Sequence, residues 1–177
     1  MTDTDVTGER GLAPAWPEGR FTGRPAFQDL LVHGLQCAAE RGCRTVWLCD
    51  PDFGDWPLGE RRLVQALDRW CATTRVSPVA QIRVLGQSFA DMRLRHGRFV
   101  QWRSLWSHRV QVRLWSAGQD RLPGMLWTPD WVLQRLDPER DQVVASTDAA
   151  QRAAAEERLQ QLWQAARPAF PDTSLGL

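Results

Sequence analysis

The sequence predicts an α/β fold, in which a mixed sheet of parallel core strands is extended by a C-terminal antiparallel hairpin and covered by helices on both faces. Residues 80–115 read as strand, helix, strand, because β-branched runs flank a segment with helical spacing. Two strands joined by such a helix lie parallel. Further on, 125–127 and 131–136 flank Thr128-Pro-Asp130, which suits a type I turn and predicts the hairpin.

The segments before residue 80 predict a helix, a strand and a second helix. Pro25 suits the first turn of a helix, and Gly42 suits its C-terminal end. Residues 44–49 are nearly all apolar, which is typical of a strand covered on both faces. Pro57 then opens the second helix, and 73–78 connect it to the next strand.

One long helix is predicted from Ser88 to about residue 106. Ser88 and Asp91 resemble a capping box at its start. His96 and Arg103 lie on its apolar face, where buried polar groups need partners. Gly97 in mid-helix lowers helix stability, so we expect it to allow the close approach of another backbone.

The chain after the hairpin adds a short strand at 143–145 and a last helix, which Ser146 or Thr147 caps and Pro168 ends. The length of 177 residues suits one domain. We expect a mobile N-terminal lead at 1–22, a single α/β domain at 23–168 and a tail at 169–177. Because the sequence has neither a membrane-spanning apolar run nor a signal-peptide pattern, we expect a cytoplasmic protein with no membrane partner.

Cysteine spacing predicts neither a disulfide framework nor a metal centre. Cys43 and Cys49 bracket one strand, which places them ~20 Å apart, too far to pair. The four cysteines form no Cys-x-x-Cys or clustered Cys/His pattern. A P-loop and a dinucleotide-binding glycine motif are also absent from the sequence. We therefore expect reduced, buried thiols, no cofactor and no zinc.

The turn after the first apolar strand is acidic, with Asp50, Asp52 and Asp55 in succession. In open α/β sheets, ligands bind outside the carboxyl ends of the strands, where this turn lies. Its carboxylates have the chemistry to hold a divalent cation. The alternative is ordinary turn chemistry, which Asp, Pro and Gly all favour. Turn chemistry is the better explanation for Asp55. For Asp50 and Asp52, both turn formation and ligand binding stay open.

Arginines dominate the segment between Met92 and Gln119, which contains no acidic residue. Such a segment binds phosphates, or its arginines simply keep a helix surface soluble. The net charge of the whole chain is only +1, which gives little support to nucleic acid as a partner. Two alternatives stay open for His96: a structural histidine with satisfied hydrogen bonds, and a ligand-facing group at the edge of a pocket.

The order of elements resembles one half of a phospholipase D superfamily domain. In that family, a hairpin with the catalytic motif precedes a helix ending in Phe-x-x-Leu-Trp, and here the last helix ends in Leu159-Gln-Gln-Leu-Trp163. The segment His96-Gly-Arg-Phe99 is similar to an uncharacterised bacterial phospholipase D-like domain, found alone or attached to acetyltransferases. The resemblance covers roughly residues 21–168 and implies the fold described above.

The catalytic motif of that family is missing. Catalytic members use a His nucleophile, a Lys two residues later and a more distant Asp, whereas the hairpin here reads Leu122-Pro-Gly-Met-Leu-Trp-Thr-Pro-Asp130. His96 and Arg98 imitate the first two members, but Arg103 stands where the Asp belongs, and all three lie on a predicted helix. The resemblance therefore transfers no catalytic residue to this chain.

Two functional hypotheses follow. The first is a non-catalytic domain that binds an anionic or phosphate-bearing ligand or a protein partner, with candidate ligand-binding residues Asp50, Asp52, His96, Arg98 and Arg103. The second is a divergent phosphodiesterase or nuclease, in which a homodimer assembles a site from His96, Arg98, Asp50 and Asp52. Because half-domains of this superfamily often pair, a homodimer fits either hypothesis.

Overall fold

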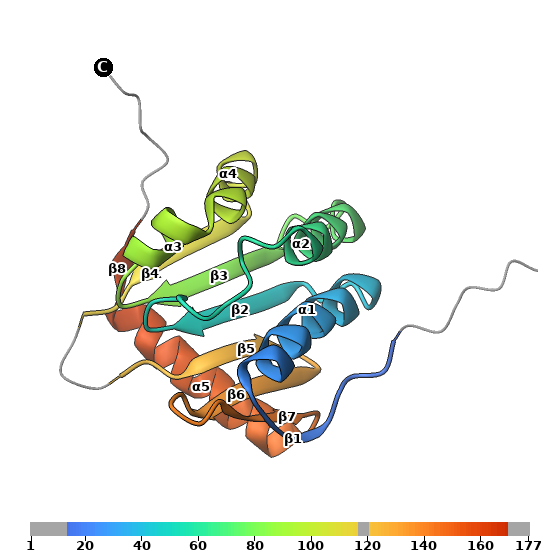
Figure 1. Cartoon of the computed structure of the whole chain (residues 1–177). Helices are drawn as coiled ribbons and strands as arrows, with labels where there is room; N and C mark the ends of the chain where they lie inside the picture. The colour runs from blue at the N-terminus through green and yellow to red at the C-terminus, as the bar shows by residue number, and fades with distance from the viewer. Residues whose placement is uncertain (1–13, 117–120, 170–177) are drawn as a thin grey trace, which may run out of the picture.

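One mixed sheet forms the centre of the molecule (Figure 1). The structure is a computed structural model and describes residues 14–116 and 121–169. The strands are β1 (Gly19–Thr22), β2 (Thr45–Asp50), β3 (Gln81–Gly86), β4 (Val110–Leu114), β5 (Gly124–Thr128), β6 (Trp131–Asp137), β7 (Gln142–Ser146) and β8 (Arg167–Pro168). Their order across the sheet is β1-β7-β6-β5-β2-β3-β4-β8.

The parallel core and the hairpin are confirmed. Strands β2, β3 and β4 pair in parallel. Strands β5 and β6 form the antiparallel hairpin around Pro129 and Asp130, and β5 joins it to β2 in antiparallel orientation. The end of β2, the end of β3 and the start of β5 consequently lie at one edge of the sheet, because Asp50 is level with Gly86 and Met125 pairs with Cys49.

Helices cover both faces of the sheet, but unequally (Figure 1). They are α1 (Arg24–Glu40), α2 (Arg61–Thr73), α3 (Ala90–Arg95), α4 (Gly97–Leu105) and α5 (Ala149–Ala165). The first four cover one face, where the larger apolar core lies, and α5 crosses the other face alone. Beneath α5, a smaller core collects Trp47, Leu85, Trp127 and Leu159. In the described part of the chain, no helix combines the length and apolarity that a membrane crossing needs.

The single helix predicted from Ser88 is wrong, because the segment folds as α3 and α4 with a break at His96. His96 has φ −114° and ψ 45°, outside the helical region, and ends one helix while it begins the next. The proposed role of Gly97 is also wrong: a methyl group placed there would meet nothing within 4 Å. The side chain of His96 is anchored to another loop, and this anchor accounts for the break.

The predicted N-terminal lead contains regular structure that its polar sequence does not indicate. Strand β1 pairs with β7 at the edge of the sheet. Ahead of it, the Trp16 ring stacks on Trp131, with ring centroids 5.4 Å apart. The expected mobility of 1–13 and all of the expected tail at 169–177 except Ala169 concern residues outside the described ranges, and the domain limits stay a prediction.

Two predicted helix starts are displaced along the chain. The second helix begins at Arg61 rather than at Pro57. The cap of α5 is Asp148, whose carboxylate accepts a hydrogen bond from the Gln151 N–H at 2.8 Å. The sequence Ser146-Thr-Asp148 offers three residues that can cap, and only the backbone path selects among them.

Helix α1 packs closely against the sheet at Gly34. A methyl group on this glycine would lie 2.9 Å from Cη2 of Trp131 and 3.0 Å from Cδ2 of Leu126. Position 34 therefore has room only for the hydrogen atom of a glycine. A larger side chain would collide with Trp131 and Leu126 of the buried hairpin.

We expect Gly34→Ala to lower the free energy of unfolding by about 1–3 kcal/mol, the usual cost of overpacking a core. The matched control is Gly97→Ala, where the added methyl group meets open space. That variant should be neutral or more stable by up to about 1 kcal/mol, because Ala favours helix over Gly. Urea unfolding followed by circular dichroism measures both changes, and equal stabilities would contradict the packing described.

Candidate functional site

The Asp50 carboxylate lies buried at the end of β2 and organises the acidic turn. One oxygen accepts hydrogen bonds from the backbone N–H of Asp52 at 3.1 Å and of Phe53 at 2.9 Å. The other accepts from the Trp56 indole at 3.0 Å. Burial raises the pKa of this carboxyl, and the three N–H donors only partly offset that effect. Asp50 is thus committed to holding the turn.

His96 holds the same turn from the other side. Its Nε2 lies 3.0 Å from the carbonyl oxygen of Phe53, and its Nδ1 accepts a hydrogen bond from the Gly59 N–H at 3.2 Å. These partners require the neutral ring with the proton on Nε2. Only 7% of the residue is exposed, which favours the structural histidine with satisfied hydrogen bonds over the ligand-facing group. Both ring nitrogens are engaged.

Asp50 and His96 meet at Phe53, which has φ 61° in the left-handed region. A non-glycine residue with this conformation is strained by roughly 1–2 kcal/mol. Its N–H bonds to Asp50 and its C=O to His96, so both flanking peptide groups are fixed. Both residues were candidates for ligand binding; what they share in the structure is a backbone anchor at Phe53.

The remaining candidates are more scattered. The Asp52 side chain accepts from the Gly54 N–H at 2.8 Å, and exposed Arg98 donates to the Gly59 carbonyl at 2.8 Å. Arg103 lies elsewhere, in a groove along β4 that Gln111 also lines. Among the described residues, no group of three or more His, Cys, Asp or Glu side chains is arranged to hold a metal ion.

Asp55 connects the acidic turn to the hairpin. Its carboxylate forms salt bridges with Arg24 at 2.7 Å and with Arg135 of β6 at 2.9 Å. Arg135 also pairs with Asp141. The charge of Arg135 is thereby balanced by two carboxylates, so it contributes little to the binding of a further anion.

The start of the hairpin, next to this ion-pair network, has no space for a catalytic side chain. Leu122 and Met125 are buried in the core beneath α5. A methyl group at Gly124 would lie 2.9 Å from Oδ2 of Asp50 and 3.1 Å from Cβ of Arg135. The buried carboxylate thus occupies the volume that a longer side chain at position 124 would need.

Two adjoining clefts open between the hairpin start and α5. One has a volume of about 480 Å³, and Gly124, Gln134 and Ala154 contribute to its wall. The other, of about 260 Å³, lies beside Trp115 and Gln161. Arg121 and Arg158 line both clefts and so mark the boundary where the two meet.

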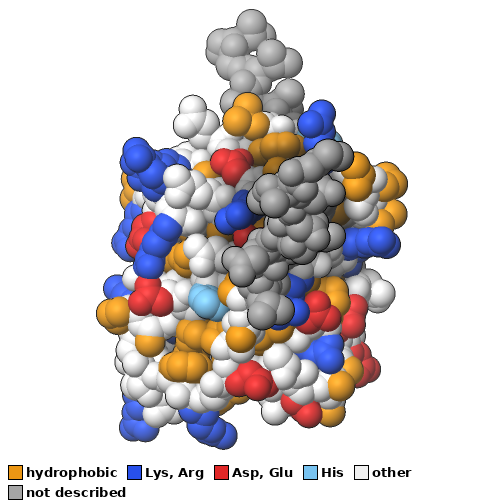
Figure 2. Space-filling model, turned by 90° about the vertical axis from the view of Figure 1, so that its right-hand side faces the viewer, with side chains coloured by type: hydrophobic (Ala, Val, Ile, Leu, Met, Phe, Trp, Pro, Cys, Tyr) orange, Lys and Arg blue, Asp and Glu red, His pale blue; other side chains and the backbone are white. Residues whose placement is uncertain are grey.

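These two arginines carry the positive charge of the clefts. Both are exposed, and no carboxylate in the described part of the chain forms a salt bridge with either. On the face drawn in Figure 2, by contrast, acidic and basic side chains are interspersed. A guanidinium without a carboxylate partner is the usual protein group for binding phosphate or carboxylate oxygens.

Sequence reasoning missed both arginines. The acid-free stretch considered for anion binding ends at Gln119, just before Arg121. Arg158 shares with Ala154, Gln161 and Ala165 a line of residues along α5, next to the apolar stripe of that helix. That spacing was a usable signal, but only the topology brings the two arginines together.

We expect His96→Ala to lower the free energy of unfolding by about 1–3 kcal/mol, because it leaves the Gly59 N–H and the Phe53 carbonyl without their partner. Arg98→Ala is the control, since it removes only an exposed bond to Gly59 and should cost much less. Thermal unfolding measures both. A His96→Ala protein with unchanged melting temperature would show that the anchor is not structural.

Comparison with known proteins adds evidence about the fold. No protein-family model matches the chain, and no curated protein matches it in sequence. A similar solved structure is TrmBL2, an archaeal chromatin protein with a novel mode of DNA binding: TM-score 0.59, 15% identity, covering 85% of this chain and 53% of TrmBL2. This chain thus spans about half the length of TrmBL2.

A second similar structure is NucT from Helicobacter pylori, a member of the phospholipase D superfamily. The TM-score is 0.55 at 10% identity, and the match covers 86% of this chain and 99% of NucT. At such identities the likeness concerns the fold alone. Together with the mixed sheet and its hairpin, it shows an α/β fold similar to those of NucT and TrmBL2.

Proposed function

We propose that this protein binds the phosphate backbone of a nucleic acid in the two clefts beside the hairpin, through Arg121 and Arg158, and does not cleave it. The observation that carries the proposal is the position of these two exposed arginines on the boundary of both clefts, where neither forms a salt bridge with a described carboxylate. Guanidinium groups bind phosphate oxygens with two parallel hydrogen bonds, which gives both affinity and orientation.

A polymer suits this arrangement better than a small phosphate compound. The clefts, of about 480 and 260 Å³, adjoin along α5. Successive units of one strand can therefore occupy neighbouring clefts while the arginines contact the phosphates between them. TrmBL2, which has a similar fold, is described as binding DNA, and this supports nucleic acid as the ligand class.

The lining of the clefts favours binding over hydrolysis. No Ser, Thr, Cys, His, Asp or Glu is among the described residues that line either cleft. Attack on phosphorus needs a nucleophile or a base that activates water. Leu122 and Gly124, at the start of the hairpin, offer neither.

The rival hypothesis of a phosphodiesterase built on His96, Arg98, Asp50 and Asp52 gains no support from the geometry. His96 would have to attack with a ring nitrogen, yet both nitrogens are engaged with backbone groups. Both carboxylate oxygens of Asp50 likewise accept hydrogen bonds from N–H groups of the turn. The homodimer stays a prediction, and the proposed clefts require only one chain.

We expect Arg121→Gln/Arg158→Gln to weaken the binding of a fluorescein-labelled single-stranded DNA oligonucleotide by about tenfold or more. The slope of log affinity against log salt should fall by about one for each arginine removed. Fluorescence anisotropy at several salt concentrations measures both quantities.

The control for this experiment is Arg61→Gln/Arg75→Gln, which changes the net charge by the same amount. Exposed Arg61 begins α2 and exposed Arg75 lies in the turn after its C-terminal cap, on the face of the sheet opposite α5. The control should bind almost as tightly as the unchanged protein. An equal loss in both double variants would show that only net charge matters, and no binding by the unchanged protein would refute the proposal.

Catalysis is tested separately. The unchanged protein should leave a bound, labelled oligonucleotide intact and should not hydrolyse bis(p-nitrophenyl) phosphate above background, because no nucleophile is among the described residues that line the clefts. Gel electrophoresis and absorbance follow the two substrates, with and without EDTA. Turnover that disappears in His96→Ala would establish the rival enzyme.

A further inference from the structure

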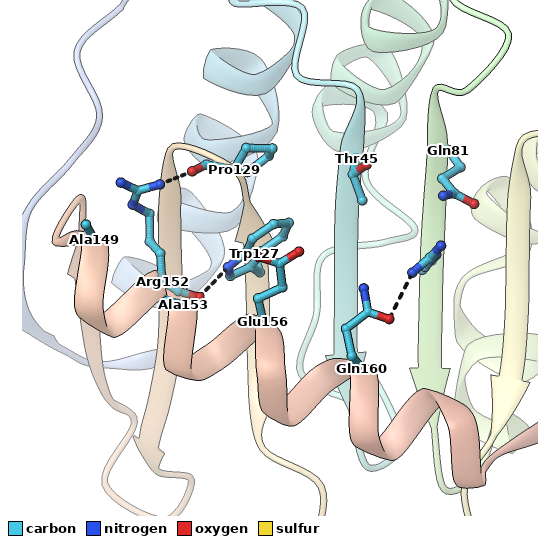
Figure 3. A pocket seen from close by; sticks show the side chains of 10 residues that line it. Thr45, Gln81, Trp127, Pro129, Ala149, Arg152, Ala153, Glu156 and Gln160 are labelled. Carbon is cyan, nitrogen blue, oxygen red and sulfur yellow. Dashed lines mark hydrogen bonds between the residues drawn. The ribbon is translucent and has the colours of Figure 1, made fainter.

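A third cleft, of about 370 Å³, lies under α5 at the other end of the sheet (Figure 3). Thr45 and Gln81, the first residues of β2 and β3, line it, so it is remote from the Asp50 edge. Trp127 and Pro129 of the hairpin form an apolar wall, and Glu156 projects from α5.

Arg83 of β3 is one of the charged residues that line this cleft. Its guanidinium lies 4.9 Å from the centre of the Trp47 ring and 5.6 Å from that of Trp163, so aromatic rings surround it. Such contacts stabilise a guanidinium but leave its N–H edge without hydrogen-bond acceptors. Its Nη1 donates one long hydrogen bond, of 3.4 Å, to Oε1 of Gln160.

The hydrogen bonds of Arg83 are therefore incomplete. Its Nε is buried and has no acceptor in the described part of the chain, and no described carboxylate forms a salt bridge with it. Burial lowers the pKa of Arg83 and neighbouring Arg113 lowers it further, while Glu156 opposes them. Arginine stays charged under such conditions, and a partly desolvated cation requires an anion.

The sheet register fixes the apolar side of the cleft. Trp127, Trp47 and Arg83 are direct neighbours across β5, β2 and β3, and hence lie in one row on the face beneath α5. The Trp127 indole donates to the carbonyl oxygen of Arg152 at 2.9 Å (Figure 3). This bond holds the ring at the cleft wall, one strand beyond Trp47.

The charges in the cleft favour a single negative charge on the ligand. Arg83 and Arg152 contribute two positive charges and Glu156 one negative charge. Arg152 is partly occupied by the backbone carbonyls of Pro129 and Thr147. A dianionic phosphate would be repelled by Glu156, whereas one carboxylate balances the remaining charge.

We propose that this cleft binds a small planar monocarboxylate, with the carboxylate on Arg83 and the flat apolar body against Trp127 and Pro129. The site shares no lining residue with the clefts that Arg121 and Arg158 line. It is therefore independent of the proposed binding of nucleic acid.

The probe for this site is benzoate, with the neutral isostere benzamide and inorganic phosphate as comparison compounds. We expect benzoate, and neither comparison compound, to shift the indole N–H signal of Trp127 saturably in ¹H–¹⁵N correlation spectra. The signal is assigned with Trp127→Phe. A shift with benzamide of the same size, a preference for phosphate, or no saturable shift with benzoate would overturn the proposal.

Arg83→Gln should weaken benzoate binding by about tenfold or more, since it removes a charge-assisted hydrogen bond. Arg83→Lys keeps the charge but lacks the planar N–H edge, and it should also weaken binding. This second variant decides the matter if Arg83→Gln does not fold. Arg75→Gln, on an exposed turn, should bind normally. Unchanged affinity in Arg83→Lys would refute the site, and Arg83→Lys should leave oligonucleotide binding intact.

Discussion

The buried carboxylate of Asp50 is the constraint on which the carboxyl edge of the sheet depends. It fixes the turn after β2 through backbone donors, holds the Trp56 indole, and occupies the space beside Gly124 at the start of the hairpin. His96 completes the arrangement by fixing the Phe53 carbonyl. Asp50 and His96 have side chains that could bind a ligand, but here they stabilise the strained loop at Phe53. We therefore expect ligand binding on other surfaces.

The two faces of the sheet differ in how completely helices cover them. On one face, α1 to α4 close the main core and anchor the loops. On the other, α5 is a single cylinder roughly 10 Å wide, which cannot cover an eight-stranded sheet. All three clefts discussed above lie along this helix, with Arg121 and Arg158 towards one end of the sheet and Arg83 towards the other.

Local patterns predicted the parallel strands, the hairpin and α5 correctly, because strand alternation and turn chemistry act over a few residues. The break at His96 could not be predicted, since its cause is a contact with Phe53, distant in sequence. Strand β1 was missed because its stability comes from pairing with β7. Asp50 and His96 were named as candidates for ligand binding, and the sequence could not show that both bond to the backbone of Phe53. Arg121 and Arg158 were not predicted as site residues, because only the fold brings them to the same two clefts.

The position of α5 in the chain has a consequence for biosynthesis. This helix, residues 149–165, is made after every strand that it covers except β8. Until it emerges from the ribosome, the indole rings of Trp47 and Trp127 and the side chain of Leu85 have no helical cover. The nascent sheet therefore exposes an apolar, aromatic surface. Chains truncated before residue 149 should aggregate through this surface rather than remain monomeric.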